Sequence, residues 1–274
     1  MSGRPTTSAL PVSHETFRGV VLRETPIKEQ DKLLTVLTAD HGLVSISAHG
    51  ARAIKSRNLT ATELLCYSEF TVEKKGEWRT LRESTLIENF YGLRSRLESF
   101  AFAQYAAQVC ADVAVEEDDE TELLQLLLNT LFLAEKSEET EKIKATFELR
   151  CCAVNGFLPD LGGCAGCGKT EGNFSLDTLG GTLFCENCAE KKRLAEAVTE
   201  SGVSSSMQKL TPSVLAAMRY VCGAPAKRIY SFTLPENEQR VMSRVCERFL
   251  LDQVGHGYDT LTFYRDLKAL PETK

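Results

Sequence analysis

Four of the ten cysteines in this chain of 274 residues have the spacing of a metal site. Cys164 and Cys167 form one Cys-x-x-Cys pair, and Cys185 and Cys188 form a second pair after an intervening segment of 17 residues. Two residues between paired cysteines allow one tight turn to present both sulfurs to the same ion. Pairs at this separation are typical of a tetrahedral zinc site with four thiolate ligands.

Four protein ligands would fill the coordination sphere and leave no position for a reacting water. The predicted Zn²⁺, one per chain, is therefore structural rather than catalytic. Four reduced thiols or two disulfides are the alternatives, and a cytosolic chain favours metal over disulfides for this pattern. The other six cysteines stand among apolar residues and are expected to pack as small hydrophobic side chains: Cys66, Cys110, Cys151, Cys152, Cys222 and Cys246.

A competing pattern occupies the same stretch. Residues 163–170 satisfy the phosphate-binding loop pattern G-x-x-x-x-G-K-[ST], with Lys169 as its lysine. Such a loop binds phosphate only where it follows a parallel strand and opens a helix. Residues 155–161 upstream are interrupted by Gly and Pro, and residues 171–175 downstream make a poor helix start. A nucleotide-hydrolysing enzyme that uses Lys169 is therefore an alternative with weaker support than the zinc site.

Composition and charge limit the possible functions. A chain with 43 % hydrophobic residues can bury a sizeable core, and its net charge of -6 argues weakly against bulk polyanion binding. The charge is uneven, since residues 1–82 hold 12 Lys and Arg against 9 Asp and Glu. Any contact with nucleic acid is therefore expected in the N-terminal part. No apolar run reaches the roughly 20 residues needed to span a membrane, and residues 1–13 lack the apolar run of a signal peptide.

Five segments near the N-terminus alternate in the manner of β-strands: residues 16–23, 31–38, 43–48, 65–74 and 78–86. Short strands with intervening glycines fit a small closed barrel, and the oligonucleotide-binding (OB) barrel is the five-stranded member of that class. Seven cations on this barrel would contact a nucleic-acid backbone: Arg18, Arg23, Lys28, Lys32, Arg52, Lys55 and Arg57. The same charges also fit an ordinary solvated face, and charge alone does not decide between the two.

The pattern becomes helical from about residue 89. Helices are predicted over residues 89–115, 123–135 and 139–155, and again over 190–200, 211–222 and 236–254. The expected fold is α+β, with a helical domain that carries an inserted four-cysteine zinc module. Its predicted parts are a disordered tail (1–13), an OB-type barrel (14–86), a helical domain in two pieces (87–160 and 191–274) and the zinc module (161–190). No constellation of catalytic residues stands out, so the protein is not expected to be an enzyme.

Several short motifs follow one another along the chain. They are Phe17-Arg-Gly-Val-Val-Leu-Arg23, Asp31-Lys-Leu-Leu-Thr35, His41-Gly-Leu-Val44, Gly50-Ala-Arg52 and Lys55-Ser-Arg57, and later Gly156-Phe-Leu-Pro159 before the four cysteines. In this order they resemble the RecO family of bacterial recombination mediators. The likeness covers nearly the whole chain from residue 17 to about residue 270.

The resemblance implies an OB barrel, a helical domain with a zinc module, and a role in DNA repair and recombination. Proteins of this family bind single- and double-stranded DNA, anneal complementary strands and, with a RecR partner, help RecA replace single-strand-binding protein. They also dock the acidic C-terminal tail of that binding protein on the helical domain. A cytoplasmic, nucleoid-associated protein is implied, with the seven cations carried over as DNA contacts. A zinc-stabilised interaction scaffold without a nucleic-acid role is a further alternative.

Overall fold

A computed structural model describes residues 12–199 and 206–270. It divides into two compact units, the first made of Met1–Tyr91 and Ala107–Leu124 and the second of Gly92–Ala106 and Gln125–Lys274. The predicted tail lies outside the described residues except for its last two positions, 12 and 13, which are already part of a strand. Within the described ranges, every helix is too short or too polar to cross a bilayer.

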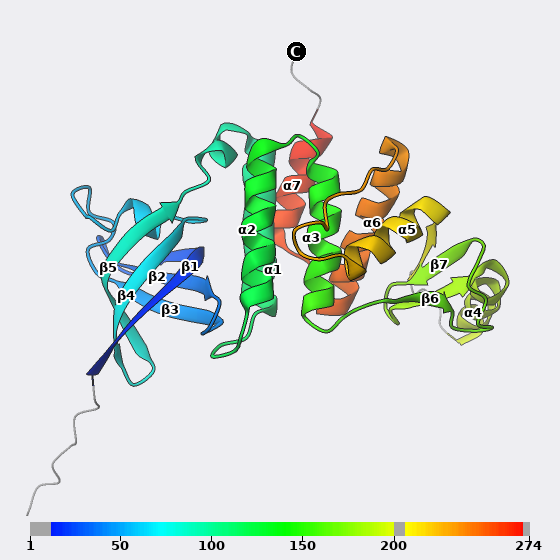
Figure 1. Cartoon of the computed structure of the whole chain (residues 1–274), viewed down its shortest axis with the longest axis horizontal. Coiled ribbons are helices and arrows are strands. Elements are labelled where there is room, and N and C mark those ends of the chain that lie inside the picture. The colour runs from blue at the N-terminus through cyan, green and yellow to red at the C-terminus, as the bar shows by residue number, and fades with distance from the viewer. Residues whose placement is uncertain (1–11, 200–205, 271–274) are drawn as a thin grey trace, which may run out of the picture. The chain divides into compact units, whose positions relative to one another are not determined.

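The first unit contains the predicted five-stranded barrel (Figure 1). Its strands are β1 (Val12–Pro26), β2 (Lys32–Thr38), β3 (Leu43–Ala48), β4 (Tyr67–Lys75) and β5 (Trp78–Glu88). The order around the barrel is β1-β2-β3-β5-β4, and only the closing pair, β3 with β5, is parallel. The long strand β1 pairs with β4 through its first part and with β2 through its second. The prediction of an OB-type barrel is confirmed.

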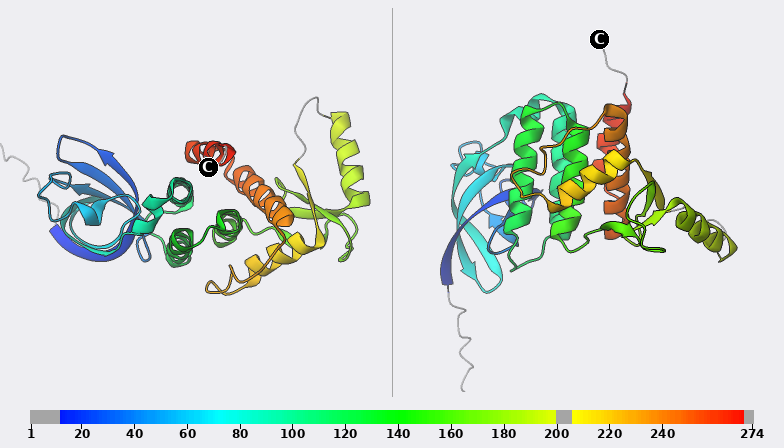
Figure 2. Two further views of the ribbon diagram at one scale, coloured as in Figure 1. Left: turned by 90° about the horizontal axis from the view of Figure 1, so that it is seen from above. Right: turned by 45° about the vertical axis from the view of Figure 1, so that its right-hand side comes forward.

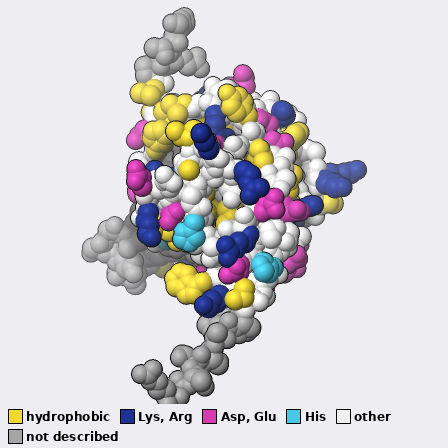
Figure 3. Space-filling view, turned by 90° about the vertical axis from the view of Figure 1, so that its left-hand side faces the viewer, with side chains coloured by type: hydrophobic (Ala, Val, Ile, Leu, Met, Phe, Trp, Pro, Cys, Tyr) yellow, Lys and Arg dark blue, Asp and Glu magenta, His cyan; other side chains and the backbone are white. Residues whose placement is uncertain are grey.

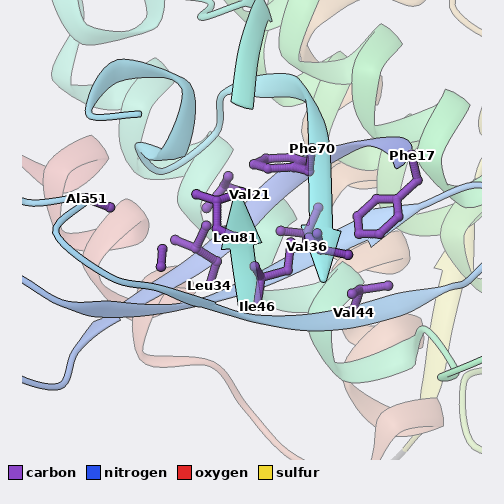
Figure 4. Packing of buried hydrophobic residues seen from close by; sticks show 11 residues of the cluster. Phe17, Val21, Leu34, Val36, Val44, Ile46, Ala51, Phe70 and Leu81 are labelled. Atoms are coloured by element: carbon purple, nitrogen blue, oxygen red, sulfur yellow. The ribbon is translucent and has the colours of Figure 1, made fainter. Parts of the chain in front are cut away.

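Alternation along the strands builds the barrel's core, because successive side chains point to opposite faces of a strand. Figure 4 shows the interior side chains converging from all five strands. The buried cluster comprises Phe17, Val21, Leu34, Val36, Val44, Ile46, Ala48, Ala51, Phe70, Val72 and Leu81. At Gly19 the strands β1 and β2 approach so closely that a Cβ atom would lie 2.5 Å from the carbonyl oxygen of Leu37. Glycine at this position therefore allows β1 and β2 to approach each other this closely.

The chain that follows α1 (Leu97–Val113) is bound to the barrel within the first unit. Gly42, in the turn between β2 and β3, has a φ of +57°, and a Cβ atom there would lie 1.9 Å from the carbonyl oxygen of Val115. The guanidinium group of Arg79, only 6 % exposed, binds the carboxylate of Glu117 at 2.6 Å. A close backbone contact and an ion pair therefore fix this segment to the strands.

The second unit is mainly helical. It includes the first part of α1 and most of α2 (Thr121–Lys136), which are both shared with the first unit. Its other large helices are α3 (Thr140–Val154), α5 (Pro212–Gly223), α6 (Glu236–Val254) and α7 (Asp259–Ala269). Helix α3 packs against α5 and α6. The predicted helices agree with these except at residues 89–96, where Phe90 has a φ of +46° and a 3₁₀ turn, η2 (Tyr91–Ser95), precedes α1. Helix α7 was not predicted.

A small sheet carries the four cysteines within the second unit (Figure 2). Its strands are β6 (Asp160–Cys164), β7 (Phe174–Asp177), β8 (Thr182–Cys185) and β9 (Met207–Leu210), in the order β6-β8-β7-β9, and α4 (Glu186–Thr199) follows β8. The strands are too short to show a periodic pattern, so the sequence did not predict them. Because β9 pairs with β7, the sheet extends beyond the predicted boundary at residue 190.

Candidate metal centre and nucleic-acid interface

The four cysteines lie where two strands end and α4 begins. Cys164 is the last residue of β6 and Cys185 the last of β8, and since these strands are parallel, both ends lie at the same edge of the sheet. The four Sγ atoms all lie within 4.8 Å of one another, and those of Cys167 and Cys185 are 3.7 Å apart. A tetrahedral ion with Zn–S bonds of about 2.3 Å separates its sulfurs by about 3.8 Å. The donor set therefore fits the predicted Zn²⁺.

The backbone around the cluster is shaped for this arrangement. A Cβ atom on Gly166 would lie 3.0 Å from the Sγ atom of Cys188, so a side chain at this position would push into the cluster. Gly168 has a φ of +74°, and its N–H donates to the carbonyl oxygen of Cys164 at 2.8 Å. The N–H of Cys185 donates to the Sγ atom of Cys164 at 3.3 Å. Such bonds to sulfur orient a thiolate ligand and favour its charged form.

Cys164 is the acidic thiol of the cluster. Burial raises the pKa of Cys164. Hydrogen bonds, among them those from the N–H groups of Cys185 and Gly166, lower it by more, so that the pKa is about 6. Hydrogen bonds with Cys185 and Cys164 raise the pKa of Cys188 to about 12. Outside the cluster, burial raises the pKa of Cys222 to about 11. One acidic thiol next to three others is a site where a dication would displace the remaining protons.

The competing phosphate-loop interpretation is not supported by the backbone. After β6 the chain forms turns over residues 165–173, and the next element is the strand β7 rather than a helix. The carbonyl oxygen of Lys169 accepts the N–H of Cys164 at 2.8 Å, as part of the cysteine turn. A phosphate loop requires amides at the start of a helix, and this stretch does not provide them. The alternative of a nucleotide-hydrolysing enzyme that uses Lys169 therefore lacks the helix after the loop that it requires.

The structure divides the seven predicted DNA-contacting cations into two groups. Six side chains are exposed: Arg18, Arg23, Lys28, Arg52, Lys55 and Arg57. Lys32 is only 3 % exposed, and its ammonium group donates to the carboxylate of Glu24 at 2.7 Å and to the carbonyl oxygen of Thr62 at 2.9 Å. The prediction of Lys32 as a DNA contact is therefore wrong, because a buried ammonium group with two partners is not available to a phosphate.

The exposed cations differ in how far they are already engaged. Arg18 pairs with Glu69 on β4 at 3.0 Å, but both side chains are well exposed and such surface pairs contribute little. Four cations form no ion pair or side-chain hydrogen bond with another described residue: Arg23, Lys28, Lys55 and Arg57. These four side chains are free to bind phosphate.

Two of the recognised motifs meet at loops of the barrel. The carboxylate of Asp31 accepts the N–H of Gly50 at 2.8 Å and lies 3.1 Å from Nδ1 of His49. The bonds from Gly50 and His49 lower the pKa of the Asp31 carboxyl. The guanidinium group of Arg52 donates to the carbonyl oxygens of Lys28 and of the next residue, both at 3.1 Å. Arg52 therefore holds the β1–β2 loop against the segment after β3, which brings Lys28 near that basic segment.

One aromatic residue of the barrel is far more exposed than the others. Phe17 and Phe70 are buried in the core, and Tyr67 is half-buried. Trp78, in contrast, is 77 % exposed at the start of β5. The two-residue turn Gly76-Glu77 indicates this exposure in the sequence, since a residue beside such a turn lies at the end of the barrel. Figure 3 shows that Lys and Arg side chains are spread over this unit among acidic and apolar ones.

Comparison with known families covers almost the whole chain. The family model for the recombination protein O N terminal matches residues 12–90, and the model for its C terminal matches residues 94–261. The junction between the two matches, at residues 91–93, falls close to the first boundary between the two compact units, after Tyr91.

Curated relatives agree with these matches. A protein named DNA repair protein RecO from Acetivibrio thermocellus is 28 % identical over 256 residues, which cover 92 % of this chain and 96 % of that protein. The protein of the same name from Listeria monocytogenes is 28 % identical over 189 residues, 69 % of this chain and 74 % of the relative. The one from Desulforudis audaxviator is 34 % identical over 175 residues, 63 % of this chain and 69 % of the relative. The chain therefore belongs to the recombination protein O (RecO) family.

Proposed function

We propose that this protein is a DNA-binding mediator of repair and recombination that binds the sugar-phosphate backbone with its barrel. The observation that carries the proposal is the set of exposed, unpaired cations on β1 and the two loops that Arg52 joins: Arg23, Lys28, Lys55 and Arg57. Phosphate contacts need only accessible cations, and each contact releases condensed counterions from the DNA. The family membership and the names of the relatives support the same role.

The proposed role is binding and not catalysis. Annealing of complementary strands requires a surface that holds two backbones, and it breaks no covalent bond. We extend the proposal to the partners that the family resemblance implies. With a RecR partner, the protein helps RecA replace single-strand-binding protein, whose acidic C-terminal tail docks on the helical unit. Such a protein acts in the cytoplasm, at the nucleoid.

The metal in this proposal is a structural Zn²⁺ bound by Cys164, Cys167, Cys185 and Cys188. The ion would supply a cross-link between the ends of β6 and β8 and the first turn of α4. The sheet is made of strands of four and five residues, which offer little surface for a core of their own. Metal binding would therefore add directly to the folding free energy of this part of the second unit.

A titration with single-stranded DNA at two salt concentrations tests the proposal. We expect binding at low salt that weakens steeply as salt is raised, with a slope that counts the phosphates contacted. Mixing the protein with complementary single strands should also accelerate their annealing. A scaffold without a nucleic-acid role would bind DNA at neither salt concentration. Absence of binding at low salt would therefore reject the proposed function and favour the scaffold.

A further inference from the structure

Trp78 occupies an unusual position for a large apolar side chain. It is the only tryptophan of the chain, and it is 77 % exposed. As the first residue of β5, it pairs with Lys75 across a two-residue turn in which Gly76 has a φ of +61°. Pairing with β4 therefore fixes the backbone of this residue. An exposed indole on a fixed backbone is a preformed contact surface with little ordering cost on binding.

The strand register places Lys75 next to Trp78 and leads from Trp78 across β3 and β2 to Arg23. Strands β3 and β5 pair Ile46 with Arg79, and continuing this register by one residue sets Trp78 beside Ser45. The row continues from Ser45 to Thr35 on β2 and from Thr35 to Arg23 on β1. Side chains directly opposite one another in a sheet lie on one face.

The burial pattern confirms that this row lies on the outer face of the barrel. Ser45 is exposed while its neighbours Val44 and Ile46 are buried in the core. Lys75 and Arg23 are exposed as well. Lys75 is next to the indole, one strand away at about 4.8 Å. Arg23 is three strands away in a closed barrel of five strands, so it lies on the other side of the barrel from Trp78.

The chemistry of the row suits an unpaired nucleotide. The indole offers a flat surface for a base, Ser45 beside it has a short polar side chain, and Lys75 offers charge to a phosphate. Lys75 forms no ion pair or side-chain hydrogen bond with another described residue. A protein partner or a lipid surface would require a wider apolar patch, and the row has only Val12 beside Lys75 as a second apolar member.

We propose that Trp78 is a base-stacking site for single-stranded DNA, with Lys75 binding a neighbouring phosphate of the same strand. This inference rests on the proposed DNA-binding function and adds a preference for single-stranded over double-stranded DNA. Bases in a duplex are stacked on their neighbours and paired, so only an unpaired base can stack on the indole. The basic loops, in contrast, bind backbone whether it is single- or double-stranded.

Intrinsic fluorescence gives a direct test, because the emission of the only tryptophan reports on Trp78 alone. The probe is an oligothymidylate added to the full-length protein. We expect saturable quenching whose midpoint agrees with the dissociation constant from filter binding. A duplex at the same nucleotide concentration should be retained on the filter with much less quenching.

Substitutions provide the second arm of the test. Trp78→Ala should weaken binding of the oligothymidylate by roughly 5- to 150-fold, the range measured for loss of one stacked base. Trp78→Phe should retain most of the affinity, and duplex binding should be the same for all three proteins. Tyr91→Ala is the matched control, since Tyr91 is an aromatic residue, 72 % exposed, outside the row. Circular dichroism should show that all variants are folded, because neither side chain is in the core.

The outcomes separate this inference from the proposed function. If the filter retains the oligothymidylate while the emission is unchanged and Trp78→Ala binds normally, the stacking site is rejected and the DNA-binding function stands. Equal weakening of single-stranded and duplex binding by Trp78→Ala, or equal weakening by Tyr91→Ala, also rejects it. If the wild-type protein binds no DNA at low salt, both proposals are rejected.

Discussion

The ammonium group of Lys32 lies 2.7 Å from the carboxylate of Glu24, and the lysine side chain is only 3 % exposed. The two residues lie on the paired strands β1 and β2. The same ammonium group donates to the carbonyl oxygen of Thr62, the last residue of the 3₁₀ turn η1 (Thr60–Thr62). A cation that the sequence predicts as a DNA contact thus links two strands and a turn, and this role differs from that of the exposed cations.

Lys32→Met should lower the free energy of unfolding by about 1–3 kcal/mol, because it leaves the carbonyl of Thr62 without its donor and the carboxylate of Glu24 without its cation. DNA affinity of the folded variant should be nearly unchanged. Lys55→Met is the matched control, since Lys55 is exposed and unpaired. Its free energy of unfolding should be nearly unchanged, and its DNA affinity should fall. Urea unfolding and DNA titration of both variants check this. A stable Lys32→Met with weaker DNA binding would contradict the assignment.

The double variant Lys55→Ala, Arg57→Ala should weaken DNA binding uniformly across sequences. Both side chains are exposed and unpaired, so the slope of affinity against salt should fall by up to about 2 units. Adding Arg52→Ala should weaken binding further and also loosen the β1–β2 loop, which its guanidinium group holds. Lys169→Ala, in the cysteine turn, is the control and should leave the slope unchanged. An unchanged slope in the double variant would show that this segment does not contact DNA.

Freshly purified, reduced protein should contain close to one zinc per chain, measured by elemental analysis. Cys185→Ser should lower both the zinc content and the thermal stability, since it removes one of four ligands from a site that cross-links short strands. Cys222→Ser is the control, because this thiol is half-buried and lies outside the cluster. Zinc retained in full by Cys185→Ser, or absent from the wild-type protein, would contradict the assignment of the ligands.

Glu148 should make stability depend on pH. Burial, opposed by Lys144 and reinforced by Glu247, raises the pKa of this carboxyl from 4.5 to about 7. The folded state therefore holds the proton more tightly than the unfolded state. The stability that this group contributes is present below pH 4.5 and is lost as the pH rises to about 7.

The variant Glu148→Gln isolates this effect, because glutamine resembles the protonated acid and does not titrate. The stability of the wild-type protein relative to the variant should fall by up to about 3 kcal/mol between pH 4.5 and 7, and should be constant above pH 8. Urea unfolding at four pH values measures the difference. A difference that is independent of pH would show that the carboxyl is charged throughout, as a partner of Lys144 at 2.8 Å.

Gly42→Ala should destabilise the first unit more than Gly50→Ala. Both glycines have a positive φ, of +57° and +64° respectively, so alanine strains the backbone at both by about 1 kcal/mol. At Gly42 the new Cβ atom would also lie 1.9 Å from the carbonyl oxygen of Val115, whereas at Gly50 there is nothing within 4 Å. Thermal unfolding of both variants measures the difference. Equal effects would show that the segment after α1 can move away without cost.

The amino-acid sequence by itself determined the elements of the barrel and the four cysteines of the candidate metal site. Alternation along residues 31–38 and 43–48 predicted β2 and β3, because the two faces of a barrel strand meet different surroundings. The spacing of the Cys-x-x-Cys pairs predicted the cluster, because a two-residue turn is a local geometry.

Only the tertiary structure decided which charged and aromatic side chains are available. Lys32 and Lys55 look alike in the sequence. In the structure Lys32 is buried and binds a carboxylate from β1 and a carbonyl oxygen from a distant turn, whereas Lys55 is exposed. Trp78 likewise is available only because β5 pairs with β4, which places its side chain beside Lys75 on the outer face of the barrel. The exposure of a side chain depends on contacts between segments far apart in the chain, and no local pattern encodes them.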